Sequence, residues 1–166
     1  MILTSTTIAF FVMSVFTLGG GFGVVTTKNM VHAALYLILS LFGMAGLYIL
    51  LEASFLAAVQ VLVYIGAIAI LITITVMVTR RIMGAESVNK QWPVSALVAA
   101  LLAATFGFVV TTQFGDVVSP AADVPADTIA NLGFALANPS AYFLPFEVAS
   151  VLLLAALIGS IFVARD

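Results

Sequence analysis

The sequence predicts an all-α integral membrane protein with five transmembrane helices, the N-terminus outside and the C-terminus inside. Three observations support this fold class. Of the 166 residues, 64% are hydrophobic and 7% are charged, whereas a soluble domain carries about 25% charged residues. The chain divides into five long apolar runs, and all of its Lys and Arg residues fall on one side of these runs. Lipid or apolar protein is therefore expected to surround most of the chain.

Each apolar run is long enough for a helix that crosses a bilayer. About 20 residues at 1.5 Å per residue cross about 30 Å of hydrocarbon, whereas barrel strands are about half as long and alternate in polarity. The runs predict helices at approximately 2–26, 31–51, 54–79, 93–114 and 142–164 in a single membrane domain, 1–166. The third of these helices is the longest, which leaves room for tilt or a bulge.

Two polar connections separate the later helices. The segment 84–92 precedes the fourth helix, and Pro93 suits its first turn because a first-turn N–H has no partner within the helix. The fourth and fifth helices are joined by a polar outer loop, 115–141, in which a short surface helix is expected from Thr128 to Ala137.

The basic residues indicate the orientation. With five crossings, the segments after the first, third and fifth helices share one side of the membrane. All five Lys and Arg residues lie in these segments: Lys28, Arg80, Arg81, Lys90 and Arg165. Basic residues favour the inner side, so the N-terminus is predicted outside. One helix more or fewer would scatter the bias, so the charges also support the helix count.

Glu147 is the first candidate for proton exchange. It is predicted to lie in the outer third of the fifth helix, where a carboxylate costs about 2.5–3.5 kcal/mol unless it faces protein or water. Pro145 is expected to free a backbone carbonyl at the same depth. An acidic residue inside the membrane is a functional candidate, and the alternative is a structural role.

The third helix carries a second set of candidates. Gln60 and Tyr64 are spaced i, i+4 and share one helix face. Both donate and accept hydrogen bonds, and both are costly when they face lipid. Gly66 follows at a point where a helix can deform or bulge. The alternative is an interhelical hydrogen bond that fixes packing.

Further polar and small residues have local interpretations. Glu52, in the turn between the second and third helices, is either part of a proton path or an interfacial carboxylate in water. Asn29 suits the N-cap of the second helix, and His32 just after it is interpreted as an interfacial anchor. Small residues allow close helix packing; they include Gly19, Gly20, Gly21, Gly23, Gly43, Gly46, Ala155 and Gly159.

The composition also excludes several kinds of site. There is no cysteine, which excludes disulfides, thiolate metal sites and iron–sulfur ligation by this chain. A single histidine is too few for a haem pair or a zinc site, and a net charge of −2 implies no nucleic-acid partner. No nucleophile–base pair, phosphate loop or cofactor motif is present. We therefore expect no catalytic residue, bound metal or bound cofactor in this chain, which favours a subunit of a larger assembly.

Three stretches of the sequence resemble a known family. They are NMVHAALYLILSL (29–41), FLAAVQVLVYIGAIAILITITVMV (55–78) and LPFEVASVLLLAALIG (144–159). The chain resembles the J-type membrane subunit of respiratory complex I, which corresponds to subunit 6 of mitochondrial NADH dehydrogenase and to the G-type subunit of plastids and cyanobacteria. The resemblance covers the first three helices and the fifth, and the fourth helix matches only in its apolar character.

The resemblance implies a non-catalytic membrane subunit of a proton-pumping NADH:quinone oxidoreductase, a respiratory-chain translocase of the bacterial cytoplasmic (inner) membrane. NADH, flavin, iron–sulfur clusters and quinone are then expected on other subunits. The implied partners are the A-, K- and H-type membrane subunits and the lipid bilayer, with no nucleic acid.

In that family the third helix carries a π-bulge, which maps here to Tyr64 and Gly66. Conversion of the bulge to regular helix is thought to open or close a water wire. The acidic residue of the last helix maps to Glu147. Some relatives have a glutamate where this chain has Gln60, and because a glutamine cannot change its charge, Gln60 at most orients water.

Two other functional classes remain open at this point. A purely structural scaffold subunit of the same complex would need the helices but none of the polar groups. A small oligomeric transporter would be expected to show an internal repeat or facing broken helices, and five helices without a visible repeat argue against it.

Overall fold

The computed structural model describes residues 4–79, 91–114, 125 and 127–165. Five helical stretches in this part of the chain are long and apolar enough to cross a membrane, which confirms the predicted fold class. Contacts between residues divide the chain into two units, 1–120 and 121–166, and each unit is described by itself. The orientation of the termini stays a prediction.

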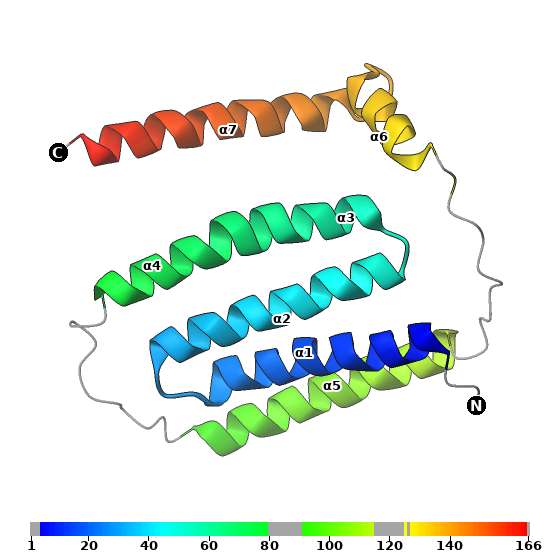
Figure 1. The fold of residues 1–166 in the computed structure, drawn as a ribbon, viewed down its shortest axis with the longest axis vertical. Helices are drawn as coiled ribbons and strands as arrows, with labels where there is room; N and C mark the ends of the chain where they lie inside the picture. Colours follow the sequence, from blue (N-terminus) through cyan, green and yellow to red (C-terminus); the bar gives the residue numbers. More distant parts are fainter. Residues whose placement is uncertain (1–3, 80–90, 115–124, 126, 166) are drawn as a thin grey trace. The chain divides into compact units, whose positions relative to one another are not determined.

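The first unit begins with two antiparallel helices, α1 (Ser5–Thr26) and α2 (Met30–Leu50), which pack along one another (Figure 1). Their backbones approach so closely that a Cβ atom added at the buried Gly20 would lie 2.7 Å from the backbone nitrogen of Ser40. The hydroxyl of Ser40 donates a hydrogen bond across the interface to the carbonyl of Thr17 at 2.8 Å. Gly20 therefore serves packing within the chain, whereas a Cβ at Gly19 would meet nothing within 4 Å.

The start of α2 is set by a side chain. Asn29 is the N-cap, and its side-chain oxygen accepts a hydrogen bond from the backbone N–H of Val31 at 3.0 Å. Such a cap satisfies one of the N–H groups that the first helical turn leaves without a partner. The N-cap predicted from the sequence is confirmed.

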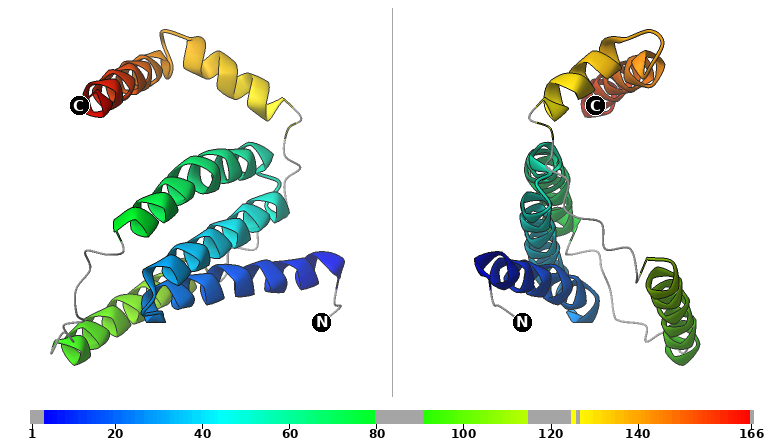
Figure 2. Two further views of the ribbon diagram at one scale, coloured as in Figure 1. Left: turned by 60° about the vertical axis from the view of Figure 1, so that its left-hand side comes forward. Right: turned by 90° about the vertical axis from the view of Figure 1, so that its right-hand side faces the viewer.

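The third spanning stretch, Ser54–Thr79, is not one regular helix. It consists of α3 (Ser54–Val59), a π-helical segment η1 (Gln60–Ala69) and α4 (Ile70–Thr79). All three parts contact α2, which lies between α1 and the third span in both Figure 1 and Figure 2.

The remaining helices are α5 (Trp92–Phe114) and, in the second unit, α6 (Thr128–Ala137) and α7 (Phe143–Ala164). The α6 helix confirms the short helix expected between the last two spans. It contacts α7, and the backbone N–H of Tyr142 donates to the carbonyl of Ala135 at 3.0 Å.

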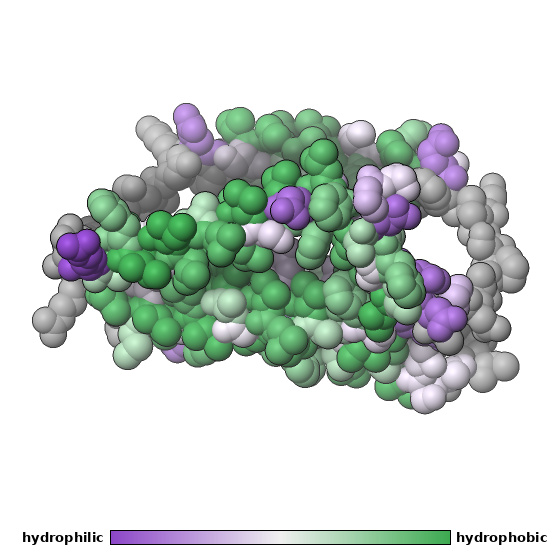
Figure 3. Space-filling view, turned by 90° about the horizontal axis from the view of Figure 1, so that it is seen from above, coloured by the Kyte–Doolittle hydropathy of each residue, from purple (hydrophilic) through white to green (hydrophobic). Residues whose placement is uncertain are grey.

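Several sequence predictions fall on parts of the chain outside the described residues. These parts include most of the connection 84–92, most of 115–127, and the basic residues Arg80, Arg81 and Lys90. The expected single domain, 1–166, also stays a prediction. In the view of Figure 3, most of the described surface is apolar, as expected for a chain whose solvent is lipid or other membrane subunits.

Candidate functional site

The π-helical segment changes which residues of the third span face α2. From Gln60 to Ala69, an α-helix with 3.6 residues per turn would make about two and a half turns and place the two residues on opposite faces. The π segment has a wider turn with an i→i+5 pattern, so it makes fewer turns over the same stretch. Gln60 and Ala69 are accordingly both buried, with exposed fractions of 6% and 1%.

Gln60 is a polar side chain held in this buried position. Its Nε2 atom donates to the backbone carbonyl of Leu41 in α2 at 3.5 Å, a long contact for an N–H···O hydrogen bond. A glutamine amide has two donor hydrogens and two acceptor lone pairs. Within the described chain, no side-chain nitrogen or oxygen is both fully buried and without a partner. The amide oxygen of Gln60, for which the structure shows no donor, therefore keeps some accessible surface.

Gln60 also lines a pocket of about 320 Å³ between α2 and the third span. Gln60 and Tyr64 line this pocket together, so the structure brings these two predicted residues to one place. The complete lining is Leu41, Met44, Tyr48, Leu56, Val59, Gln60 and Tyr64. Tyr64 is 46% exposed. The pocket contains one amide and two phenols in an otherwise apolar wall.

Tyr48 is the polar lining residue that sequence reasoning missed. The signal was present in the hairpin itself, since α2 and α3 are antiparallel and joined by a short turn around Glu52. Residues equally distant from that turn lie at the same depth, which pairs Tyr48 with Leu56 and Met44 with Gln60. Tyr48 therefore lies about one helical turn nearer to Glu52 than Gln60 does.

Gly66 lies inside the π-helical segment, at the position that the family resemblance associates with a bulge. A Cβ added here would lie 3.3 Å from the backbone oxygen of Val61, five residues earlier. This is the carbonyl that an i→i+5 pattern brings close to residue 66. A side chain at this position would therefore crowd the π form of the helix.

Glu52 occupies a strained position at the end of α2. Its φ is +57°, and it is the one positive-φ residue other than glycine in the described chain. The N–H of Glu52 donates to Ile49 at 3.0 Å and the N–H of Ala53 donates to Tyr48 at 2.9 Å. This pair of bonds is a Schellman motif, in which the left-handed position favours glycine. Glu52, whose side chain is exposed, therefore occupies a backbone position that favours glycine.

Glu147 lies in the second unit, in α7, and its side chain is exposed in the described chain. Since α7 begins at Phe143, Pro145 falls in its first turn. The residue four positions before Pro145 is outside the helix, so Pro145 frees no helical carbonyl beside Glu147. That expectation was wrong, because the helix starts too late for it.

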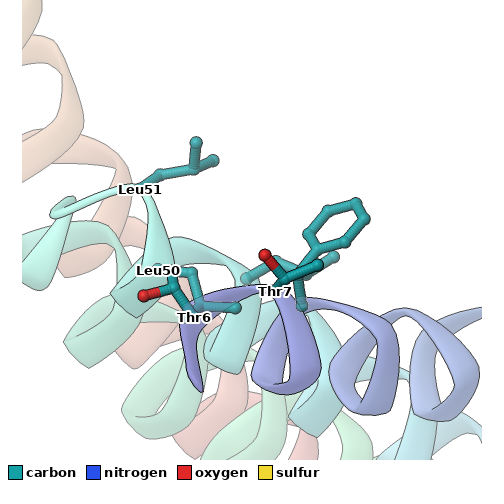
Figure 4. A pocket seen from close by; sticks show the side chains of 6 residues that line it. Thr6, Thr7, Leu50 and Leu51 are labelled. Atoms are coloured by element: carbon teal, nitrogen blue, oxygen red, sulfur yellow. The ribbon is translucent and has the colours of Figure 1, made fainter. Parts of the chain in front are cut away.

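A second pocket, of about 300 Å³, lies where the start of α1 meets the end of α2 (Figure 4). Its wall is apolar apart from the hydroxyls of Thr6 and Thr7, and it includes Leu50 and Leu51. It contains no titratable side chain.

His32 is exposed in the first turn of α2. No group of three His, Cys, Asp or Glu residues that could hold a metal occurs in the described part of the chain.

Comparison with known proteins shows the family of this chain. The family profile described as NADH-ubiquinone/plastoquinone oxidoreductase chain 6 matches residues 20–163. F(420)H(2) dehydrogenase subunit J of Methanosarcina mazei is 46% identical over 145 residues, which are 86% of this chain and 81% of that protein. NAD(P)H-quinone oxidoreductase chain 6 of Leptolyngbya boryana is 35% identical over 162 residues, or 95% and 79% of the two chains. The chain therefore belongs to the NADH-ubiquinone/plastoquinone oxidoreductase chain 6 family, as the resemblance in its first three spans and its fifth span predicted.

Proposed function

We propose that this chain is a membrane subunit of a multisubunit quinone oxidoreductase and helps couple quinone reduction to proton translocation. It contributes no catalytic centre, and the electron donor, flavin, iron–sulfur clusters and quinone belong to other subunits. The observation that carries the proposal is the π-helical segment η1 in the third span of a chain 6 family member. The segment places a buried amide and a tyrosine beside one pocket.

The coupling element is the third span itself. Conversion of η1 to regular α-helix would rotate Ala69 relative to Gln60, because the 3.6 residues per turn of an α-helix replace the wider π turn. Residues of α4 would turn with it. Such a change exchanges the side chains that face α2, and two discrete packings of one helix are the kind of two-state element that a switch requires. Tyr64 lies in the middle of the segment.

The proposed surroundings follow from the family. The partners are the A-, K- and H-type membrane subunits and the lipid bilayer, and Glu147 exchanges protons at the start of the last span. The proposed location is the bacterial cytoplasmic membrane. Relatives also occur elsewhere: one is F(420)H(2) dehydrogenase subunit J of Methanosarcina mazei, and another is a chloroplastic NAD(P)H-quinone oxidoreductase subunit 6 of Mesostigma viride.

The orientation proposed from the five basic residues has its own test. In intact cells, a membrane-impermeant thiol reagent is expected to modify a Glu52→Cys variant and to leave Lys28→Cys unmodified. Because the chain has no natural cysteine, each variant carries a single thiol in this subunit. The reverse labelling pattern would contradict the proposed orientation.

The function is tested in the purified complex, reconstituted in vesicles with the donor that the complex oxidises. Tyr64→Phe and Glu147→Gln are expected to lower the number of protons pumped per electron while assembly and electron transfer persist. Tyr36→Phe is the matched control, since Tyr36 packs against Gly23 of α1 and does not line the pocket.

Three other outcomes oppose the proposal. Full pumping by both variants in assembled complexes favours a purely structural scaffold. Loss of assembly in both variants, with Tyr36→Phe unaffected, also favours a structural role. A purified particle that contains only copies of this chain favours an oligomeric transporter.

A further inference from the structure

We infer that α6 lies along the membrane surface, with a stripe of three apolar side chains immersed in the lipid beside the start of α7. The stripe consists of Ile129, Leu132 and Leu136. The partner of this helix face is therefore the acyl-chain region of the bilayer and not another protein. The inference concerns how the second unit is anchored, and it does not depend on the proposed coupling role.

The length and composition of α6 suit the boundary between water and lipid. Its ten residues, Thr128–Ala137, extend about 15 Å at 1.5 Å per residue, which is about half of the hydrocarbon thickness, so the helix cannot cross the membrane. None of these residues is charged, whereas Asp127 directly before them is exposed and carries a carboxylate. A short apolar helix of this kind is typical of an interfacial segment.

A hydrogen-bonded corner holds the end of α6 at the start of α7. The backbone N–H of Tyr142 donates to the carbonyl of Ala135 at 3.0 Å, and the N–H of Ala141 donates to the carbonyl of Asn138 at 3.0 Å. The side-chain oxygen of Asn138 accepts from the N–H of Ser140 at 3.0 Å and from its hydroxyl at 2.8 Å. Figures 1 and 2 show α6 at an angle to α7 and not in line with it. Because α7 is long and apolar enough to span, the corner keeps α6 close to the lipid.

The stripe follows one face of α6. Ile129, Leu132 and Leu136 are spaced i, i+3 and i+7, which places them on one side of an α-helix. Leu136, the nearest of the three to α7, is half-buried, whereas Ile129 and Leu132 are 55% and 36% exposed. The described chain therefore covers the stripe at its α7 end and leaves the rest open. Lipid can take up this open part, because an interfacial helix buries its apolar face about 5–10 Å into the headgroup and acyl boundary.

The opposite side of α6 is more polar. Asn131 is two residues from Ile129, and at 3.6 residues per turn their side chains point about 160° apart. The exposed amide of Asn131 would lose its hydrogen bonds to water if it entered the lipid. Phe134 also lies on this side, as a single exposed apolar residue of the kind that is common on protein surfaces. The two sides therefore favour a helix that is immersed on one face only.

The contact is tested by photocrosslinking from the lipid, in the complete complex without any substitution. The complex is reconstituted into nanodiscs that contain a phosphatidylcholine with a photoreactive diazirine in its acyl chain. After illumination, adducts on this subunit are located by mass spectrometry, and adducts on other spans of the complex show that the probe reacted. We expect several-fold more lipid adduct on Ile129 and Leu132 than on Asn131, because only the stripe reaches the acyl chains.

Two results would overturn the inference. If α6 carries no lipid adduct while other spans do, water or a partner subunit covers the stripe. If Asn131 is labelled as strongly as the stripe, α6 is immersed on both sides and does not lie at the surface.

Substitutions give a second measurement on the assembled complex. Ile129→Asn and Leu132→Asn together place two amides on the stripe, and we expect the lipid adducts on α6 to fall several-fold. Phe134→Asn is the matched control, since it adds the same amide on the opposite side, and it is expected to leave the yield unchanged. A fall in Phe134→Asn without a fall in the double variant would show that the opposite side faces the lipid, against the inference.

Discussion

Replacement of Gly66 by alanine is expected to shift the third span from its π form toward regular α-helix. In an α-helix, alanine is more favourable than glycine by about 0.8–1 kcal/mol. In the π form, the new methyl group would lie 3.3 Å from the backbone oxygen of Val61, so some or all of this gain is lost in the π form alone. The equilibrium between the two forms is therefore expected to move by up to about 1 kcal/mol, or about fivefold.

Two measurements on the Gly66→Ala complex check this reasoning. Electron cryomicroscopy is expected to show a larger fraction of particles with a regular third span, and reconstituted vesicles are expected to pump fewer protons per electron. The matched control is Gly107→Ala in α5, where a Cβ would meet nothing within 4 Å and the helix is regular. The control is expected to change neither quantity. An unchanged π segment and unchanged pumping in Gly66→Ala would refute the argument.

Substitutions at three further positions test the packing of the first unit and its turn. Gly20→Ala would place a methyl group 2.7 Å from the backbone of Ser40; we expect a loss of about 1–3 kcal/mol, seen as a lower melting temperature of the complex in detergent, with Gly19→Ala unaffected. Ser40→Ala removes the 2.8 Å hydrogen bond to Thr17 and is expected to cost about 0.6 kcal/mol in the same assay. Glu52→Gly relieves the φ of +57° and is expected to stabilise the turn by about 1–2 kcal/mol. Glu52→Gln removes the carboxylate but keeps the backbone strain, whereas Glu52→Gly removes both. A loss of proton pumping in both variants would therefore be due to the missing carboxylate.

The parts of the fold that follow from local sequence were predicted well. Spanning helices depend on length and apolar character, because any backbone polar group in lipid must be satisfied within its own segment. The five spans and the short α6 helix could therefore be located without tertiary information. The N-cap at Asn29 depends on a bond within its own first turn, so it too could be read locally.

The candidate site depended partly on contacts between helices. The sequence alone identified Gln60, Tyr64 and Gly66 as polar or flexible positions of the third span. It did not identify Tyr48, because a tyrosine near the end of a span is equally suited to the membrane interface. The wrong expectation that Pro145 frees a helical carbonyl has a related cause, since the effect of a proline depends on where its helix begins.

What the sequence by itself determined is the set of membrane-spanning helices and the family to which the chain belongs. What only the tertiary structure decided is which faces of these helices meet. A helix of regular period would place Gln60 and Ala69 on opposite sides, and the π segment brings both to the buried side. The π segment packs against α2, and these contacts involve residues about 20 positions away along the chain. One of them is Leu41, whose backbone carbonyl accepts a hydrogen bond from the side-chain amide of Gln60.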